Sequence, residues 1–295
     1  MIDLHCHSTA SDGKYTPSEL VELAVKKGVS VLGIADHDTL GGLSEGVEAG
    51  KARNFRVIPG IELSVNAPWG SLHLLGYFSR PDPPNVAGRV GEIQSFREHR
   101  NPLIAKRLQE LGISISYEVV VRSAGGQVIG RPHFAQVMLD MGAVSSTQEA
   151  FDRFLKKGAP AYVDRQRLDI RDAIRLIRAD NGIPVLAHPG LIPLANPNAE
   201  IGKVVKSFAE MGGLGIEAYS PVHSQSFTEI LLESASRNQL LVTGGTDFHG
   251  DSKPKLQLGI GEGDFLVPDE LMAPLMAALG ETLNPGRMLP HSAAS

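Results

Sequence analysis

The segment IDLHCHSTASDG, residues 2–13, predicts the first strand of the fold and the beginning of a functional site. Apolar and polar side chains alternate up to two histidines spaced i, i+2, as expected of a β-strand. Successive side chains of a strand point to opposite faces, so His5 and His7 share one face and Cys6 takes the other. A short turn then carries Asp12. Two imidazoles at a strand end, followed by a carboxylate, are typical of a metal site.

Strands and helices alternate along most of the remaining chain. A helix over 17–27 is predicted from Thr16-Pro17-Ser18-Glu19, in which Thr16 is the N-cap and Glu19 completes a capping box. Short apolar strands are predicted over 31–35, 56–65, 72–77, 183–187, 215–219 and 240–244, and further helices over 42–53, 169–181, 198–211, 224–237 and 268–280. This alternation predicts a parallel sheet covered by helices, either a barrel or an open doubly wound sheet.

The alternation is interrupted after a proline-rich segment at 81–85. Residues 88–165 show only helical periodicity, with helices predicted near 88–111, 117–124, 132–141 and 147–157. We therefore expect a barrel domain formed by residues 1–80 and 166–295, and an inserted helical subdomain at 81–165 that contributes substrate contacts.

Composition narrows the class of protein. The chain has 295 residues, 42% of them hydrophobic and 21% charged, which is typical of a globular protein. Its net charge of -5 argues against long nucleic acid or a membrane surface as partner. One cysteine excludes an intrachain disulfide, and neither a signal peptide nor a long apolar run is evident, so we expect a cytoplasmic protein.

Polar residues stand at the ends of nearly all the predicted strands. Barrel enzymes draw their sites from several strand ends, whereas an open sheet gathers its site mainly at one switch point, so this placement favours a barrel. A histidine near a strand is, taken singly, more often structural than metal-ligating; the joint pattern favours ligation. The candidate ligands are His5, His7, Asp12, His37, Glu62, His73, His188, Asp247 and His249.

Nine groups exceed the three protein ligands of a typical catalytic zinc, so they suit two or three ions bridged by carboxylates such as Glu62 and Asp247. Mixed imidazole and carboxylate ligands suit zinc, manganese or iron rather than magnesium or calcium. Such a centre lowers the pKa of a bound water and stabilises both oxygens of an in-line displacement. The chemistry favoured is hydrolysis of a phosphoester.

Seven motifs in order resemble the PHP family, named for polymerase and histidinol phosphatase. They are His5-x-His7, Asp12-Gly13, Asp36-His37-Asp38, Pro59-Gly60-x-Glu62, His73-x-x-Gly76, Ala187-His188-Pro189 and Thr246-Asp247-Phe248-His249. The resemblance covers about residues 1–80 and 180–250 and implies an α/β fold, a distorted (β/α)7 TIM-like barrel, with a trinuclear site. It implies three ligand sets: His5, His7, Glu62 and Asp247; Asp12, His37 and His249; and Glu62, His73 and His188.

The insertion contains Gly130-Arg131-Pro132-His133, which resembles the bacterial subgroup acting on nucleoside 3′,5′-bisphosphates and on 5′ ends of short RNA. Arg131 has a planar fork suited to phosphate, and His133 can donate beside it. From the residues alone, Arg131 equally fits a surface ion pair and His133 a helix start; the resemblance favours the phosphate role. Whether Arg97, Arg100 and Lys106 form a solvated face or a basic rim stays open. Asp36 and Asp38 are expected to orient ligand imidazoles.

The expected reaction is hydrolysis of a phosphomonoester of a nucleoside 3′,5′-bisphosphate to a 5′-nucleotide and phosphate by a metal-bound hydroxide. Arg131 would neutralise phosphoryl oxygens and water or His133 would protonate the leaving oxygen, with Asp247 and His249 completing the catalytic set. The alternatives are a 5′→3′ exoribonuclease on short oligonucleotides, a histidinol-phosphate phosphatase, an amidohydrolase, and a catalytically silent metal-binding or polymerase-associated module. The sequence leaves the native metal and the oligomeric state open.

Overall fold

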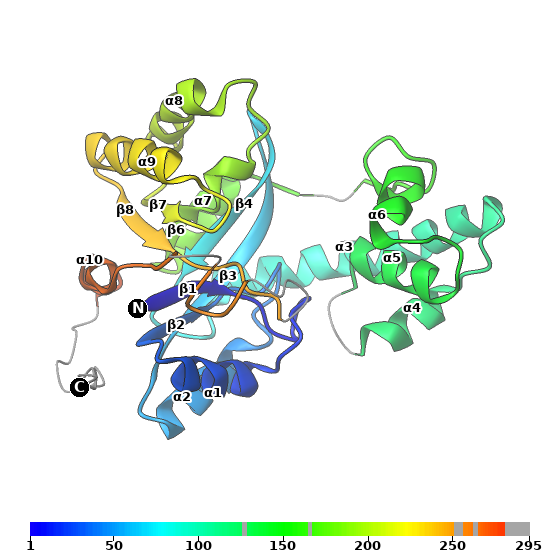
Figure 1. The fold of residues 1–295 in the computed structure, drawn as a ribbon, viewed down its shortest axis with the longest axis horizontal. Coiled ribbons are helices and arrows are strands. Elements are labelled where there is room, and N and C mark those ends of the chain that lie inside the picture. The colour runs from blue at the N-terminus through cyan, green and yellow to red at the C-terminus, as the bar shows by residue number, and fades with distance from the viewer. Residues whose placement is uncertain (126–128, 165–166, 251–255, 262–264, 281–295) are drawn as a thin grey trace. The chain divides into compact units, whose positions relative to one another are not determined.

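The computed structural model describes residues 1–125, 129–164, 167–250, 256–261 and 265–280, except for the side chains of residues 94 and 96–98 (Figure 1). The chain divides into two compact units. The first comprises Met1–Ala87 and Leu168–Ser295, and the second comprises Gly88–Arg167. No helix among the described residues has the length and apolar character needed to cross a membrane.

The first unit is built on one mixed sheet. Its strands are β1 (Ile2–Cys6), β2 (Val31–Ile34), β3 (Arg56–Ala67), β4 (Gly70–Tyr77), β5 (Leu168–Asp169), β6 (Ile183–Leu186), β7 (Gly215–Tyr219) and β8 (Leu241–Gly244). Their order is β1-β2-β3-β4-β6-β7-β8, with β5 paired to β3. The segment after β8 returns to β1: Asp247 donates its N–H to the His5 carbonyl at 2.9 Å, and His7 donates to that of Phe248 at 2.9 Å. The sheet is therefore nearly closed, which confirms the predicted distorted barrel.

One strand runs against the prediction of a parallel sheet. β4 is antiparallel both to β3 and to β6. The physical reason is the short turn after β3: Ala67 pairs with Gly70, leaving Pro68 and Trp69 as the connection. Two residues can join only antiparallel strands, because a parallel neighbour needs a crossover of a dozen or more residues.

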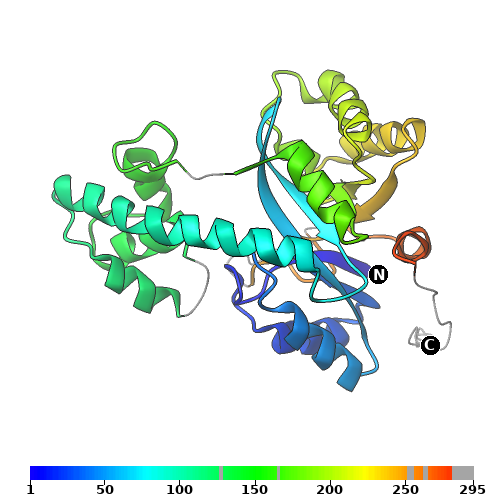
Figure 2. The same cartoon turned by 180° about the vertical axis from the view of Figure 1, so that it is seen from behind.

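Helices cover the outside of the barrel. They are α1 (Pro17–Lys27), α2 (Leu43–Ala52), α7 (Ile170–Ala179), α8 (Pro197–Glu210), α9 (Gln225–Arg237) and α10 (Met272–Ala278), with 3-10 turns at Pro189–Leu191 and Asp269–Leu271. The predicted capping box of α1 is present, and Gly28 ends that helix in the left-handed conformation. Helices α1 and α2 lie side by side against one part of the barrel, and α8 and α9 against another (Figures 1 and 2).

The barrel interior is a packed core rather than a channel. Ile2, Leu4, Ile58, Leu75 and Tyr77 belong to one buried cluster. The Tyr77 hydroxyl crosses this interior and donates a hydrogen bond to the Leu4 carbonyl at 3.0 Å. Because the interior is filled, a functional site in this unit must lie at an end of the barrel or outside it.

The second unit contains helices and no strand within its described part. Helix α3 (Pro84–Glu110) leads into it, followed by α4 (Tyr117–Ala124), α5 (Arg131–Asp140), α6 (Thr147–Ala150) and a π-helical turn at Phe151–Leu155. Its own core includes Leu108, Ile115, Val120, Phe134 and Met138. This core is separate from that of the barrel, so the unit has the packing of an independent subdomain.

Candidate metal centre

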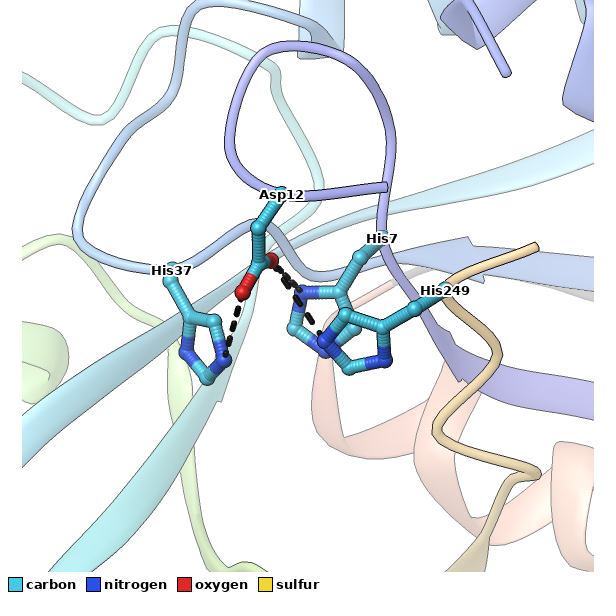
Figure 3. Close-up of side chains that lie close together, drawn as sticks. All are labelled: His7, Asp12, His37 and His249. Carbon is cyan, nitrogen blue, oxygen red and sulfur yellow. Dashed lines mark ion pairs between the residues drawn. The ribbon is translucent and has the colours of Figure 1, made fainter. Parts of the chain in front are cut away.

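All nine predicted ligand side chains lie in one cluster at the end of the barrel where β1, β2, β6 and β8 finish. Strand β1 contains His5, and the segment that follows it carries His7 and Asp12. His37, His188 and the pair Asp247 and His249 follow β2, β6 and β8. Figure 3 shows His7, Asp12, His37 and His249 pointing toward one another. Segments distant in sequence therefore meet because their strands end at the same rim.

His73 reaches the same rim for a reason that the sequence did not show. It lies in the first half of β4, opposite Ser64 of β3. Because β4 runs antiparallel to its neighbours, its amino-terminal half lies beside their carboxyl ends. The prediction that His73 stands near the rim is therefore correct in place, although the strand direction behind it was wrong.

Glu62 is the centre of the cluster. It is fully buried, and its Oε1 lies 2.9 Å from both His73 Nδ1 and His188 Nε2. Its Oε2 lies 2.8 Å from His37 Nδ1 and 3.4 Å from the Nε2 atoms of His5 and His7. Each carboxylate oxygen thus faces a different group of imidazoles, which is the arrangement needed to bridge two ions.

Three overlapping groups have donor atoms within 4.8 Å of one another: His5, His7, Glu62 and Asp247; His7, Asp12, His37 and His249; and His37, Glu62 and His73. The first has the composition implied by the family resemblance, and the second adds His7 to the implied set. The third contains His37 where the resemblance implies His188. His188 Nε2 nevertheless lies 3.4 Å from His73 Nδ1 as well as close to Glu62.

The donor atoms fit metal ions better than they fit one another. Buried His7 Nδ1, Asp12 Oδ1, His37 Nδ1 and Glu62 Oε2 have no hydrogen-bond partner among the described residues. Two of them, His37 Nδ1 and Glu62 Oε2, are only 2.8 Å apart, yet without the geometry of a hydrogen bond. Leaving such groups unpaired is costly, and divalent ions would remove that cost. The nitrogen and oxygen donors suit zinc, manganese or iron.

Electrostatics keep the carboxylates ionised. Burial alone would raise the pKa of Glu62, but the neighbouring imidazoles of His73 and His37 hold it well below its ordinary value. Burial opposes protonation of His37, yet Glu62 and Asp12 outweigh it and raise the His37 pKa to about 9. His7 behaves oppositely: burial and the imidazoles of His249 and His37 lower its pKa to about 3. Metal binding must therefore displace a proton from His37 at neutral pH.

Buried carboxylates outside the cluster hold the loops that carry it. Asp36 accepts hydrogen bonds from the N–H of Ser8 at 2.7 Å and from the hydroxyls of Ser8 and Ser11 at 2.6 Å each. These bonds hold the turn that carries Asp12, which differs from the predicted role of orienting an imidazole. Asp38 accepts from the Ser64 N–H at 2.9 Å.

Sequence analysis assigned no role to Asp3 and Glu217. Asp3 accepts from the Thr246 N–H at 3.0 Å, the Thr246 hydroxyl at 2.6 Å and the Gly259 N–H at 2.9 Å, and so anchors the segment carrying Asp247. Glu217 contacts His5 and the backbone of His188. The available signal was a carboxylate inside an otherwise apolar strand, as at Glu62.

Three of the six described non-glycine residues with positive φ lie at or beside the site. Asp38, His188 and Asp247 have φ angles of 48°, 26° and 54°, in the left-handed region that L-residues rarely adopt. Such conformations cost about 1–3 kcal/mol each and persist where the surroundings enforce them. The hydrogen bonds of the Asp247 and His188 N–H groups to His5 and Glu217 are part of that enforcement.

Residues predicted in the insertion occupy the second unit. Arg131 Nη1 donates to the Leu155 carbonyl at 3.0 Å, and its guanidinium lies 5.1 Å from the centroid of the Tyr162 ring. His133 Nδ1 accepts from the Gly130 N–H at 3.1 Å at the start of α5. Arg100 is buried and donates to Asn101 Oδ1 at 2.7 Å, so it does not line a solvated face. Lys106 is exposed, and the Arg97 side chain lies outside the described side chains.

Comparison with known proteins places the chain in a family. Residues 3–111 match the model of the PHP domain. A 5′-3′ exoribonuclease of Haemophilus influenzae is 34% identical over 84% of this chain and 89% of its own length. A 3′,5′-nucleoside bisphosphate phosphatase of Chromobacterium violaceum is 32% identical over 88% of this chain and 90% of its own.

Solved structures agree. A Bifidobacterium adolescentis protein described as a presumptive metal-dependent phosphoesterase is 27% identical, with a TM-score of 0.79 over 96% of this chain and 97% of its own. A Chromobacterium violaceum amidohydrolase, solved with bound sulfate and no metal, is 30% identical, with a TM-score of 0.79 over 94% of this chain and 96% of its own. With its clustered imidazoles and carboxylates, this chain therefore belongs to the PHP-domain family of metal-dependent phosphoesterases.

Proposed function

We propose that this phosphoesterase hydrolyses a phosphomonoester of a nucleoside 3′,5′-bisphosphate, releasing a 5′-nucleotide and phosphate. The observation that carries the proposal is the cluster centred on Glu62, whose two oxygens face separate groups of imidazoles. The substrate class is supported by the Chromobacterium violaceum relative named for that activity. Bound sulfate in the related amidohydrolase structure supports binding of a tetrahedral dianion by this fold.

Two or three divalent ions, manganese, iron or zinc, would be held by three sets of residues. These are His5, His7, Glu62 and Asp247; Asp12, His37 and His249; and Glu62, His73 and His188. Bound in this way, such ions supply a nucleophile from water at neutral pH and neutralise charge on phosphoryl oxygens.

The cluster has a buried side and an accessible side. His5, His7 and Glu62 are fully buried, whereas the side chains of Asp12, His37, His73, Asp247 and His249 are 21–30% exposed. A phosphoryl group would approach from the accessible side. There the ionised Asp247 can accept a hydrogen bond from the attacking water, and His249 Nδ1 donates to the Asp247 carbonyl at 2.8 Å, which directs its Nε2 toward Asp12.

Arg131 and His133 would bind the substrate phosphates from the helical unit. Arg131 lies over Tyr162, whose hydroxyl donates to Asp164 at 2.7 Å, and Asp164 pairs with Arg167 at 3.3 Å. Burial and the charge of Arg167 lower the pKa of Arg131, whereas Tyr162 and Asp164 raise it; a bound phosphate dianion would favour the charged guanidinium. Because His133 Nδ1 accepts from Gly130, a neutral ring carries its proton on Nε2, which can donate to an oxygen of substrate.

A 5′→3′ exoribonuclease acting on short oligonucleotides is the second candidate. It is favoured by the Haemophilus influenzae relative and by an Escherichia coli relative named 5′-3′ exoribonuclease Rnm, 34% identical over 87% of each chain. Both candidates use the same metal centre and expel the same leaving group, the 3′-oxygen of a 5′-nucleotide. They differ in whether the scissile phosphate is a monoester or carries a second ester to the rest of an oligonucleotide. Action on long nucleic acid is not part of the proposal, and a cytoplasmic location stays a prediction.

The test is release of inorganic phosphate from adenosine 3′,5′-bisphosphate by manganese-loaded protein, beside release of 5′-nucleotides from a short RNA. His7→Ala should abolish both activities, and Arg131→Ala should lower them. Phosphate release no greater than that of His7→Ala, with an active RNA reaction, would transfer the assignment to the exoribonuclease. Equal rates for wild type and Arg131→Ala would contradict the phosphate role of Arg131.

A further inference from the structure

Glu217 is a buried carboxylate that contacts two proposed metal ligands from behind the cluster. Its Oε1 lies 2.9 Å from His5 Nδ1, and its Oε2 accepts a hydrogen bond from the His188 N–H at 2.7 Å. We propose that Glu217 is a positioning residue that sets the tautomer of His5 and holds the backbone of His188, so that both rings present Nε2 to the metal centre. The inference rests on the ligand sets in the proposed function.

The contact with His5 determines which of its ring nitrogens faces the cluster. A carboxylate is an acceptor at both oxygens, so the His5 nitrogen beside it must carry a proton. In the neutral ring, the form that binds an ion, the other nitrogen, Nε2, then has a free lone pair. It lies 3.4 Å from Glu62 Oε2, 3.2 Å from His7 Nε2 and 3.5 Å from Asp247 Oδ1, among the atoms that would surround an ion. Hydrogen bonding of the second nitrogen is how proteins fix a metal-binding imidazole.

The contact with His188 acts on the backbone. The φ angle of 26° at His188 is unusual for a residue with a side chain, and the N–H at this strained position points to Glu217 Oε2. A hydrogen bond to a charged acceptor is stronger than one between neutral groups, and this bond offsets the cost of such a conformation. This bend after β6 brings His188 Nε2 to 2.9 Å from Glu62 Oε1.

Only a carboxylate of this length satisfies both partners. The His188 N–H is an obligatory donor, and His5 Nδ1 must donate when Nε2 binds an ion. Glutamine offers one acceptor oxygen and one NH₂ group, so one of the two donors would face another donor. If the NH₂ group faced His5, it would stabilise the tautomer with a proton on Nε2 and remove that lone pair from the cluster. Glu217→Gln is therefore close in shape but cannot replace the function.

Glu217 also links two of the proposed ligand sets. His5 belongs to the set with His7, Glu62 and Asp247, and His188 to the set with Glu62 and His73. The set of Asp12, His37 and His249 has no contact with Glu217 in the described hydrogen bonds; its turn is held by Asp36. Loss of Glu217 should therefore weaken two sets and spare the third.

The experiment uses metal-free full-length protein titrated with Zn²⁺ against a chromogenic chelator, with bound zinc counted by mass spectrometry. Glu217→Gln should bind the ions of its two sets about tenfold to a hundredfold more weakly, as removal of such supporting partners does elsewhere. Asp36→Asn is the matched variant and should instead weaken the Asp12 set. His7→Ala reports direct loss of a ligand.

Two further measurements distinguish the proposed positioning role of Glu217 from a purely structural role. In zinc-loaded protein labelled with ¹⁵N-histidine, NMR should show His5 protonated on Nδ1, and Glu217→Gln should shift or remove that signal. In a His5→Ala background, Glu217→Gln should cost less zinc affinity than in wild type, because one of its two contacts is already absent. A variant that loses thermal stability but keeps wild-type zinc affinity, zinc count and the His5 signal would overturn the inference.

The outcomes distinguish this inference from the proposed function. If wild-type protein binds no zinc or manganese, the ligand sets fail and the role of Glu217 fails with them. If wild type binds two or more ions and Glu217→Gln binds them equally, only the role of Glu217 fails.

Discussion

Replacing Asp3 by Asn should loosen the segment that carries Asp247 while changing almost no volume. Asp3 is fully buried, and its Oδ2 accepts from the Thr246 hydroxyl and from the Gly259 N–H at 2.9 Å. In Asn one of the two oxygens becomes an NH₂ group. The Thr246 hydroxyl can rotate and accept a hydrogen bond from this NH₂ group. The Gly259 N–H can only donate, so it loses its acceptor and faces another donor.

The magnitude can be worked from these bonds. A hydrogen bond to a charged group contributes about 1.5–3 kcal/mol, and an unsatisfied buried donor costs a similar amount. Removing a buried charge offsets part of the loss, because burial raises the pKa of Asp3 despite its hydrogen bonds. A net loss of about 2 kcal/mol corresponds to a decrease in Tm of about 4–8 °C for a domain of this size.

Thermal denaturation followed by circular dichroism, with and without Mn²⁺, tests the reasoning. Asp3→Asn should lower the Tm of metal-free protein, and the added stabilisation by Mn²⁺ should shrink by about 1.4 kcal/mol for each tenfold loss of affinity. Asp82→Asn is the control: its exposed ion pair with Arg80 should contribute little to stability, so its Tm should stay close to that of wild type. If the Tm of Asp3→Asn lies within about 1 °C of the wild-type Tm, the argument that asparagine leaves the Gly259 N–H without an acceptor is refuted.

Three further changes test other parts of the molecule. In Gly245→Ala the new methyl group would lie 2.5 Å from His5 N, so we expect about 1–3 kcal/mol lower stability and weaker metal binding by equilibrium titration. The pKa of His37 is raised to about 9, so protonated His37 stabilises the metal-free protein fully below pH 6.5, and this stabilisation is lost as the pH rises through 9. The free energy of unfolding should therefore fall by up to about 3 kcal/mol between these pH values in metal-free protein, and should not do so in zinc-loaded protein. Arg131→Lys should lower kcat/KM about tenfold or more because lysine lacks the planar fork, whereas the exposed Arg122→Lys should not.

Local patterns were sufficient to predict most elements and the residues at the rim. The i, i+2 spacing of His5 and His7 follows from strand geometry alone, and the capping box at Thr16 and Glu19 defines the start of α1. Strands bounded by glycine and polar residues place His37, His188 and Asp247 at strand ends without any knowledge of the sheet order.

The features that could not be predicted depend on contacts between distant residues. The direction of β4 is set by a two-residue turn whose strand ends, Ala67 and Gly70, look like part of a longer loop in the sequence. Asp3 contacts Thr246 and Glu217 contacts His5, and in each pair the two residues are more than 200 positions apart in the chain. A buried carboxylate inside an apolar strand indicates that a partner exists, but only the fold identifies it.

The arrangement of supporting carboxylates explains how loop segments of the chain can form a precise centre. Most of the proposed ligands stand on segments that follow strands, where backbone order is ordinarily weakest. Asp3 holds the segment of Thr246, Asp36 holds the turn of Ser8 and Ser11, and Glu217 holds His188. Each carboxylate accepts two or more donors, so a loop cannot shift without leaving a buried charge short of partners. Burying three charges is unfavourable, but because each charge is stabilised by donors from a loop, the three carboxylates keep the loops at the rim in place. Each carboxylate acts on a different part of the ligand set.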